Sequence, residues 1–84
     1  MLVEWLEAAM RGTQFELIEN EPPWYGEIPE CEGVWAVGDS AENCRIELAS
    51  VLGGWLLLGL RMGDPIPVMG GIDLAMQNEP LVHG

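Results

Sequence analysis

The spacing of hydrophobic residues changes along this chain, and each spacing predicts a different element. Residues 2–11 place apolar side chains on one helical face and Glu4 and Glu7 on the other, which predicts a short amphipathic helix that stops at Gly12. The apolar face comprises Leu2, Trp5, Leu6 and Ala9.

Three short segments follow, residues 13–20, 24–28 and 34–37, and each predicts a strand. Phe15 and Leu17 alternate with polar residues in the first, and Pro or Gly residues separate the three from one another. Because connections this short join neighbouring antiparallel strands, we expect a three-stranded meander.

A helical period then takes over and predicts a long helix over residues 41–62. Ser40 is a good N-cap residue, and Gly63 followed by Pro65 is a typical helix end. The predicted core stripe of this helix is Cys44, Leu48, Val51, Trp55, Leu58 and Met62.

The second half of this helix is apolar nearly all round, because no charged residue follows Glu47 until Arg61. A helix of this kind is covered on both sides. We therefore expect a homo-oligomer, a dimer or a tetramer, although the N-terminal helix is an alternative cover. The residues expected at the oligomer interface are Leu52, Trp55, Leu56 and Leu57. Gly53 and Gly54 cost about 1 kcal/mol each relative to Ala, and either a close backbone approach or a local kink accounts for them.

Beyond the helix, Pro65 to Met69 predicts a short edge strand, and residues 72–74 are expected to dock on the domain. The predicted fold class is α+β: a two-layer domain with a three- to four-stranded antiparallel sheet, the long helix on one face and a short N-terminal helix. The expected division is an N-terminal helix at 1–12, a domain at 13–72 and a tail at 73–84.

The charge of the chain narrows its partners. Fourteen Asp and Glu residues against three Lys and Arg give a net charge of −11. Direct nucleic-acid binding and binding to an anionic membrane are disfavoured because both need clustered cations. A basic protein partner is compatible, although acidic surfaces also serve solubility alone. The uncharged stretch 48–60 is shorter than the roughly 20 residues of a membrane span, and no leader pattern opens the chain, so a cytoplasmic location is expected.

Candidate chemistry is sparse. Cys31 and Cys44 lack the spacing of a zinc site and are expected to be buried free thiols, and His83 lies in the predicted tail. No lysine is present for a phosphate-binding loop. We therefore expect no catalytic, metal-binding or cofactor-binding residue.

Aromatic and acidic residues cluster in the second strand and the turn after it. Aromatic rings beside carboxylates suit a surface that binds Arg or Lys side chains. The residues expected to bind a partner are Trp24, Tyr25, Glu27, Glu30 and Glu32. The alternative for each tryptophan, including Trp35 on the third strand, is a place in the core.

The order of these elements, with four local signatures, resembles the HicB antitoxin family over about residues 13–68. The matching pieces are WYGEIP at 24–29, ECEGV at 30–34, GDS at 38–40 and GDPIP at 63–67. The resemblance implies a degraded RNase H-like β-β-β-α-β domain without nuclease activity, self-association, and capture of HicA, a small basic toxin that cleaves mRNA. Two features depart from the family pattern: no DNA-binding domain is expected here, and the N-terminal helix is extra.

Two functions follow as hypotheses. The first is an antitoxin-like module that neutralises a basic HicA-type toxin by direct binding. The alternative is a stand-alone oligomeric scaffold or regulator with another partner and no toxin. A residual nuclease or hydrolase rests on the implied fold alone.

Overall fold

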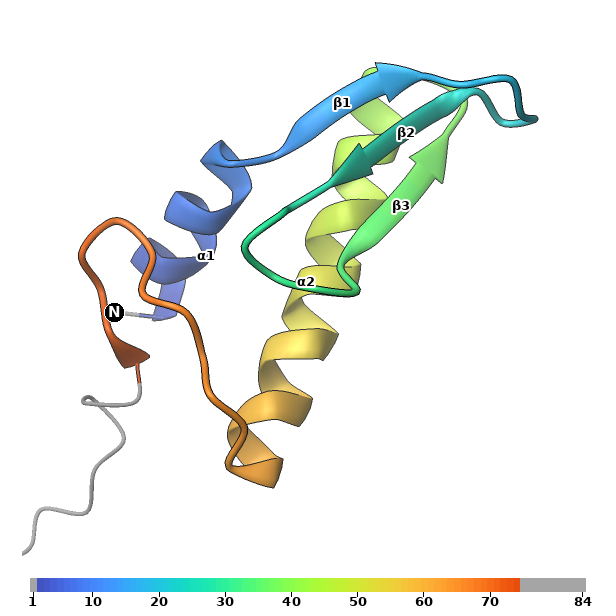
Figure 1. Cartoon of the computed structure of the whole chain (residues 1–84). Helices are drawn as coiled ribbons and strands as arrows, with labels where there is room; N and C mark the ends of the chain where they lie inside the picture. The colour runs from blue at the N-terminus through green and yellow to red at the C-terminus, as the bar shows by residue number, and fades with distance from the viewer. Residues whose placement is uncertain (1, 75–84) are drawn as a thin grey trace, which may run out of the picture.

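The structure, a computed structural model, describes residues 2–74 as two helices and a small sheet. The elements are α1 (Leu2–Arg11), β1 (Gln14–Leu17), β2 (Trp24–Glu27), β3 (Trp35–Gly38) and α2 (Ala41–Met62). The sheet lies on one side of α2, and α1 lies next to α2 before the start of β1 (Figure 1). The predicted α+β class, both helices and the three strands are confirmed.

The sheet is the predicted antiparallel meander, with strand order β1-β2-β3. Residues that pair across strands share a face of the sheet. The face toward α2 therefore carries Phe15, Gly26 and Ala36 in one row and Leu17, Trp24 and Gly38 in the next. The outer face carries Gln14, Glu27 and Trp35 in one row and Glu16, Tyr25 and Val37 in the other.

The start of α2 packs very closely on this sheet because glycines face it. A Cβ on Gly38 would lie 2.5 Å from the backbone nitrogen of Cys44, and one on Gly26 would lie 3.0 Å from its Sγ. The Cys44 thiol donates a hydrogen bond of 3.4 Å to the Ala36 carbonyl oxygen. The contact between helix and sheet is thus backbone against backbone at this end.

Both ends of α2 lie where the sequence predicted them. The Ser40 side chain accepts a hydrogen bond of 3.1 Å from the Asn43 N–H. At the other end, Gly63 adopts a left-handed conformation with φ 74°, which glycine reaches without steric cost.

The predicted core stripe is wrong in the second half of α2. The buried residues are Cys44, Leu48, Leu52, Leu56 and Gly59, whereas Val51, Leu58 and Met62 are exposed. Steps of four residues drift about 40° round the helix each time. The buried side turns in this way because the sheet covers the first half of α2, while α1 and the segment after the helix contribute to the core farther along.

The length of α2 explains why it needs several covers. A 22-residue helix is about 33 Å long, whereas a four-residue strand spans about 13 Å. The second half of α2 consequently runs past the sheet (Figure 1).

The segment after α2 closes the core without forming the predicted edge strand. Pro65 and Pro67 lack the N–H that a ladder needs, and within residues 2–74 only an isolated bridge joins Met69 to Ile72. The Trp5 indole donates a hydrogen bond of 2.9 Å to the Pro67 carbonyl oxygen, so α1 and this segment are tied together. The predicted docking of residues 72–74 is confirmed, since Leu74 is buried. Most of the predicted tail, with His83, lies outside the described residues.

Candidate functional site

The outer face of the sheet, opposite α2, brings an aromatic pair together. Tyr25 of β2 and Trp35 of β3 stack with ring centroids 6.2 Å apart and an interplanar angle of 25°. Trp35 remains 53% exposed. An exposed aromatic surface of this kind offers a π-face to a cation.

A carboxylate is held in place beside these rings. The Tyr25 hydroxyl donates a hydrogen bond of 2.7 Å to Oε1 of Glu27, and Glu27 pairs with Trp35 across the strands. This hydrogen bond, which stabilises the neutral phenol, raises the pKa of Tyr25, and desolvation adds to it. Tyr25 therefore stays a donor at neutral pH and orients the carboxylate.

The turn between β2 and β3 extends this surface into a small cavity of about 280 Å³. The cavity is lined by Tyr25, Glu27 and Trp35 of the strands and by turn residues that include Pro29, Cys31, Glu32 and Gly33. Backbone hydrogen bonds link Ile28 to Val34 at 3.2 Å and Val34 to Cys31 at 3.0 Å. Because Ile28, Cys31 and Val34 are also buried, the wall of the cavity is built into the fold.

The structure brings together three of the five residues predicted to bind a partner: Tyr25, Glu27 and Glu32 all line the cavity. Glu30 is exposed on the same turn without lining it. The prediction that Trp24 shares this surface is wrong, since Trp24 lies on the opposite face of the sheet, in the row of Leu17 and Gly38.

The physical reason is strand alternation, which sends adjacent side chains to opposite faces. This rule, applied to β2 alone, would have separated Trp24 from Tyr25. Trp35 was missing from the predicted site because its place beside Glu27 depends on the register of the β2–β3 hairpin.

The two cysteines are buried free thiols, as predicted. Burial, with a smaller contribution from the charge of Glu30, raises the pKa of Cys31 to about 11. Burial also raises the pKa of Cys44. Both thiols stay protonated at neutral pH, and the thiolate is the nucleophilic and metal-binding form. Within residues 2–74, no group of three or more His, Cys, Asp or Glu side chains could hold a metal ion.

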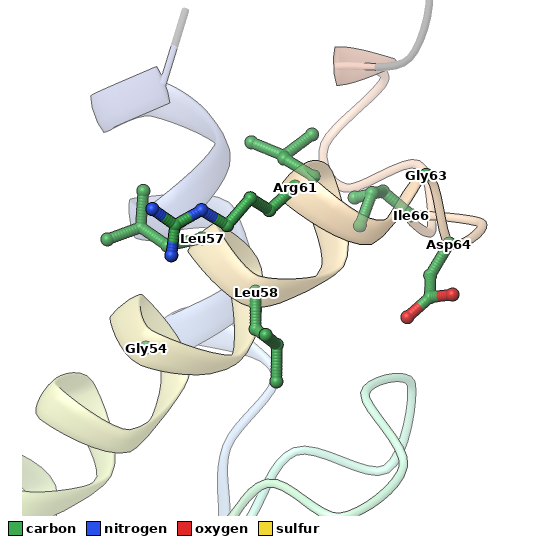
Figure 2. Close-up of a pocket in the computed structure, with 8 residues that line it drawn as sticks. Gly54, Leu57, Leu58, Arg61, Gly63, Asp64 and Ile66 are labelled. Atoms are coloured by element: carbon green, nitrogen blue, oxygen red, sulfur yellow. The ribbon is translucent and has the colours of Figure 1, made fainter.

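A second and larger hollow, of about 800 Å³, lies along the end of α2 (Figure 2). It is lined by Gly54, Leu57, Leu58, Leu60, Arg61, Gly63, Asp64 and Ile66. Of the residues predicted at an oligomer interface, only Leu57 lines it. The prediction for Leu52 and Leu56 is wrong, because these side chains are 0% and 1% exposed and belong to the core of the chain itself. Trp55 packs against that core. The sequence predicted Leu58 in the core. The buried side of α2 turns away from this position, and Leu58 lines the hollow at the end of the helix.

No helix in the part of the chain that the structure describes has the length and apolar character to cross a membrane.

Comparison with known proteins relates the whole arrangement to a family. The crystal structure of TTHA0281 from Thermus thermophilus is similar to this chain, with 40% sequence identity and a TM-score of 0.82. The similarity covers 98% of this chain and 95% of that one. No curated protein matches the sequence. The UPF0150-like family model matches residues 4–67, a range that includes most of α1, so the N-terminal helix is part of the pattern of this family. The chain belongs to the UPF0150-like family.

Proposed function

We propose that this chain is a protein-binding module of the antitoxin type, which captures a small basic protein on the outer face of its sheet. The observation that carries the proposal is the cavity in which Tyr25, Trp35, Glu27 and Glu32 meet.

The chemistry of this cavity suits the side chain of an arginine. A guanidinium stacks on an aromatic face and donates two parallel N–H hydrogen bonds to a carboxylate. Trp35 supplies the exposed ring, and Glu27, oriented by Tyr25, supplies the carboxylate. Glu32 adds a second negative charge at the rim of the cavity.

The net charge of −11 supports the same partner at longer range. A negative field of this size steers a basic protein toward the surface and weakens as salt screens it. The cavity then determines which part of that protein is held.

The resemblance to HicB antitoxins suggests the identity of the partner, a HicA-type mRNA-cleaving toxin that is neutralised by direct binding. The proposal assigns no catalysis, cofactor or nucleic-acid contact to this chain. The two free cysteines fit a reducing compartment such as the cytoplasm.

A pull-down with the tagged full chain from its own cells, at low and high salt, tests the proposal. Recovery of a small basic protein that high salt releases is the expected result. The purified partner is then titrated against three variants. Trp35→Ala and Glu27→Gln each weaken binding by about 10-fold or more. Glu47→Gln, which removes the same charge from an exposed site on α2, leaves it nearly unchanged.

Equal effects of Glu27→Gln and Glu47→Gln would contradict a role for the cavity and leave only a field effect. Recovery of the chain alone would instead favour the second candidate, an oligomeric scaffold without a toxin. The observation on the side of that candidate is the row of exposed apolar residues on α2.

A further inference from the structure

The second half of α2 carries an apolar surface that residues 2–74 leave uncovered. This surface, the Leu57 face, consists of Val51, Gly54, Leu57, Leu58, Arg61 and Met62. Leu57 is 64% exposed, Leu58 58% and Met62 68%. Single exposed apolar residues are ordinary, but a contiguous row on one helix marks an interaction surface.

We infer that the Leu57 face is the contact between two copies of this chain, whose α2 helices pack together around a two-fold axis near Gly54. In such a contact each surface meets its own copy, so it must offer both a protrusion and a recess. Leu57 and Leu58 project from α2 one turn after Gly54 (Figure 2). Because the axis passes near Gly54, Leu57 of each copy lies opposite Val51 of the other, and the recess is the space that the glycine leaves open.

Within residues 2–74, nothing requires a glycine at position 54. Gly54 lies in the interior of α2 without a left-handed backbone, and a Cβ placed on it would meet nothing within 4 Å. Glycine is unfavourable inside a helix, whereas a small residue allows two helices to approach closely. A Cβ on Gly53 would also meet nothing within 4 Å. Gly53 lies about 100° away from Gly54 round the helix, so a contact between two copies at Gly54 does not explain the glycine at position 53.

The distribution of charge indicates a second copy as the occupant. Two chains of net charge −11 repel each other wherever their carboxylates meet. The Leu57 face contains no carboxylate and one cation, Arg61, with Asp64 at the end of the same hollow. A basic protein, in contrast, is attracted to the acidic parts of the surface.

The size of the face agrees with a dimer contact. Its four apolar side chains expose roughly 400 Å² per copy, and a standard interface buries about 800 Å² per partner, of which somewhat over half is apolar. The Leu57 face thus supplies nearly the whole apolar share of one such interface.

Light scattering after size-exclusion chromatography of the full chain tests the inference. The expected mass is twice the 9.2 kDa of one chain at micromolar concentration. Combining Leu57→Glu with Leu58→Glu raises the dimer Kd at least about 100-fold, since four carboxylates enter the contact. The matched control is Leu17→Glu, because Leu17 is also 64% exposed but lies on β1, and this variant remains a dimer.

A crosslinking experiment keeps the inference testable if the double variant fails to fold. Gly54→Cys forms a disulfide-linked dimer on mild oxidation, whereas Glu42→Cys, at the other end of the same helix, does not. A monomer at all concentrations tested overturns the inference. So does a dimer that withstands the double Leu→Glu substitution and leaves Gly54→Cys uncrosslinked.

The response to salt separates this inference from the proposed function. Screening reduces the repulsion between two acidic copies, so the dimer Kd falls as salt rises. Capture of a basic protein responds in the opposite direction. A dimer that salt dissociates would contradict an apolar contact between like charges.

Discussion

The two halves of α2 belong to one uninterrupted helix, but they expose different kinds of side chain to solvent. In the first half the buried residues Cys44 and Leu48 oppose an exposed side with Glu42, Arg45 and Glu47. In the second half Leu52 and Leu56 are buried, yet the exposed side is apolar. Amphipathicity therefore identifies a core face only where the exposed side of the helix is polar. Where both sides are apolar, the pattern leaves open which side the chain covers by itself.

The largest expected effect is the loss of a buried leucine from the second half. Leu52→Ala lowers the free energy of unfolding by about 3–5 kcal/mol, because it removes a fully buried side chain and leaves a cavity. Leu17→Ala, at a position on β1 that is 64% exposed and lies outside the Leu57 face, costs less than about 1 kcal/mol. Urea denaturation followed by circular dichroism, at one fixed protein concentration, measures both. Equal losses of unfolding free energy in the two variants would mean that Leu52 does not lie on the buried side of α2.

The glycine that faces the helix start gives the next largest effect. Gly38→Ala lowers the free energy of unfolding by about 1–3 kcal/mol or more, since the new Cβ would lie 2.5 Å from the backbone of Cys44, which cannot move aside as a side chain can. Thermal unfolding detects this change as a fall in Tm. A neutral result would show that the first half of α2 packs less closely on the sheet than it does here.

A glycine in the second half has the opposite expectation. Gly53→Ala raises the free energy of unfolding by up to about 1 kcal/mol, because a Cβ there meets nothing within 4 Å and alanine favours the helix. The same thermal melts give the sign directly. A clear loss of stability would reveal a contact to Gly53 and would also support a kink as the reason for the glycine pair.

The smallest effect concerns the outer sheet face. Tyr25 is the only tyrosine of the chain, so the ultraviolet absorbance of its phenolate follows one group. Its pKa lies above 10.0 because Glu27 accepts its proton in a hydrogen bond. Since the folded-state pKa is raised, the stabilisation is present below pH 10 and is lost as the pH rises through the folded-state value. Glu27→Gln returns the midpoint toward 10, and an unchanged midpoint would contradict the hydrogen bond.

The candidate site illustrates how far local patterns reach. The concentration of aromatic and acidic residues in β2 and its turn pointed to Tyr25, Glu27 and Glu32, which line one cavity. Pairing between strands then decided the rest. Alternation within β2 alone turns Trp24 to the other face. The register that places Trp35 beside Glu27 joins residues of two segments, and no window along the chain contains that information.

Local patterns in the sequence were enough to predict both helices, the three strands and the two ends of α2. Ser40 and Gly63 act through backbone groups within one turn of the helix, and Pro and Gly interrupt the strands locally, so a linear reading captures them. The net charge and the free state of the two cysteines could likewise be predicted from the sequence. Two features became clear only in the folded chain: which side of the second half of α2 is buried, and that residues 65–69 close the core without joining the sheet. Both depend on a sheet too short to cover the helix and on Trp5 of α1 reaching the carbonyl oxygen of Pro67, contacts between residues far apart along the chain.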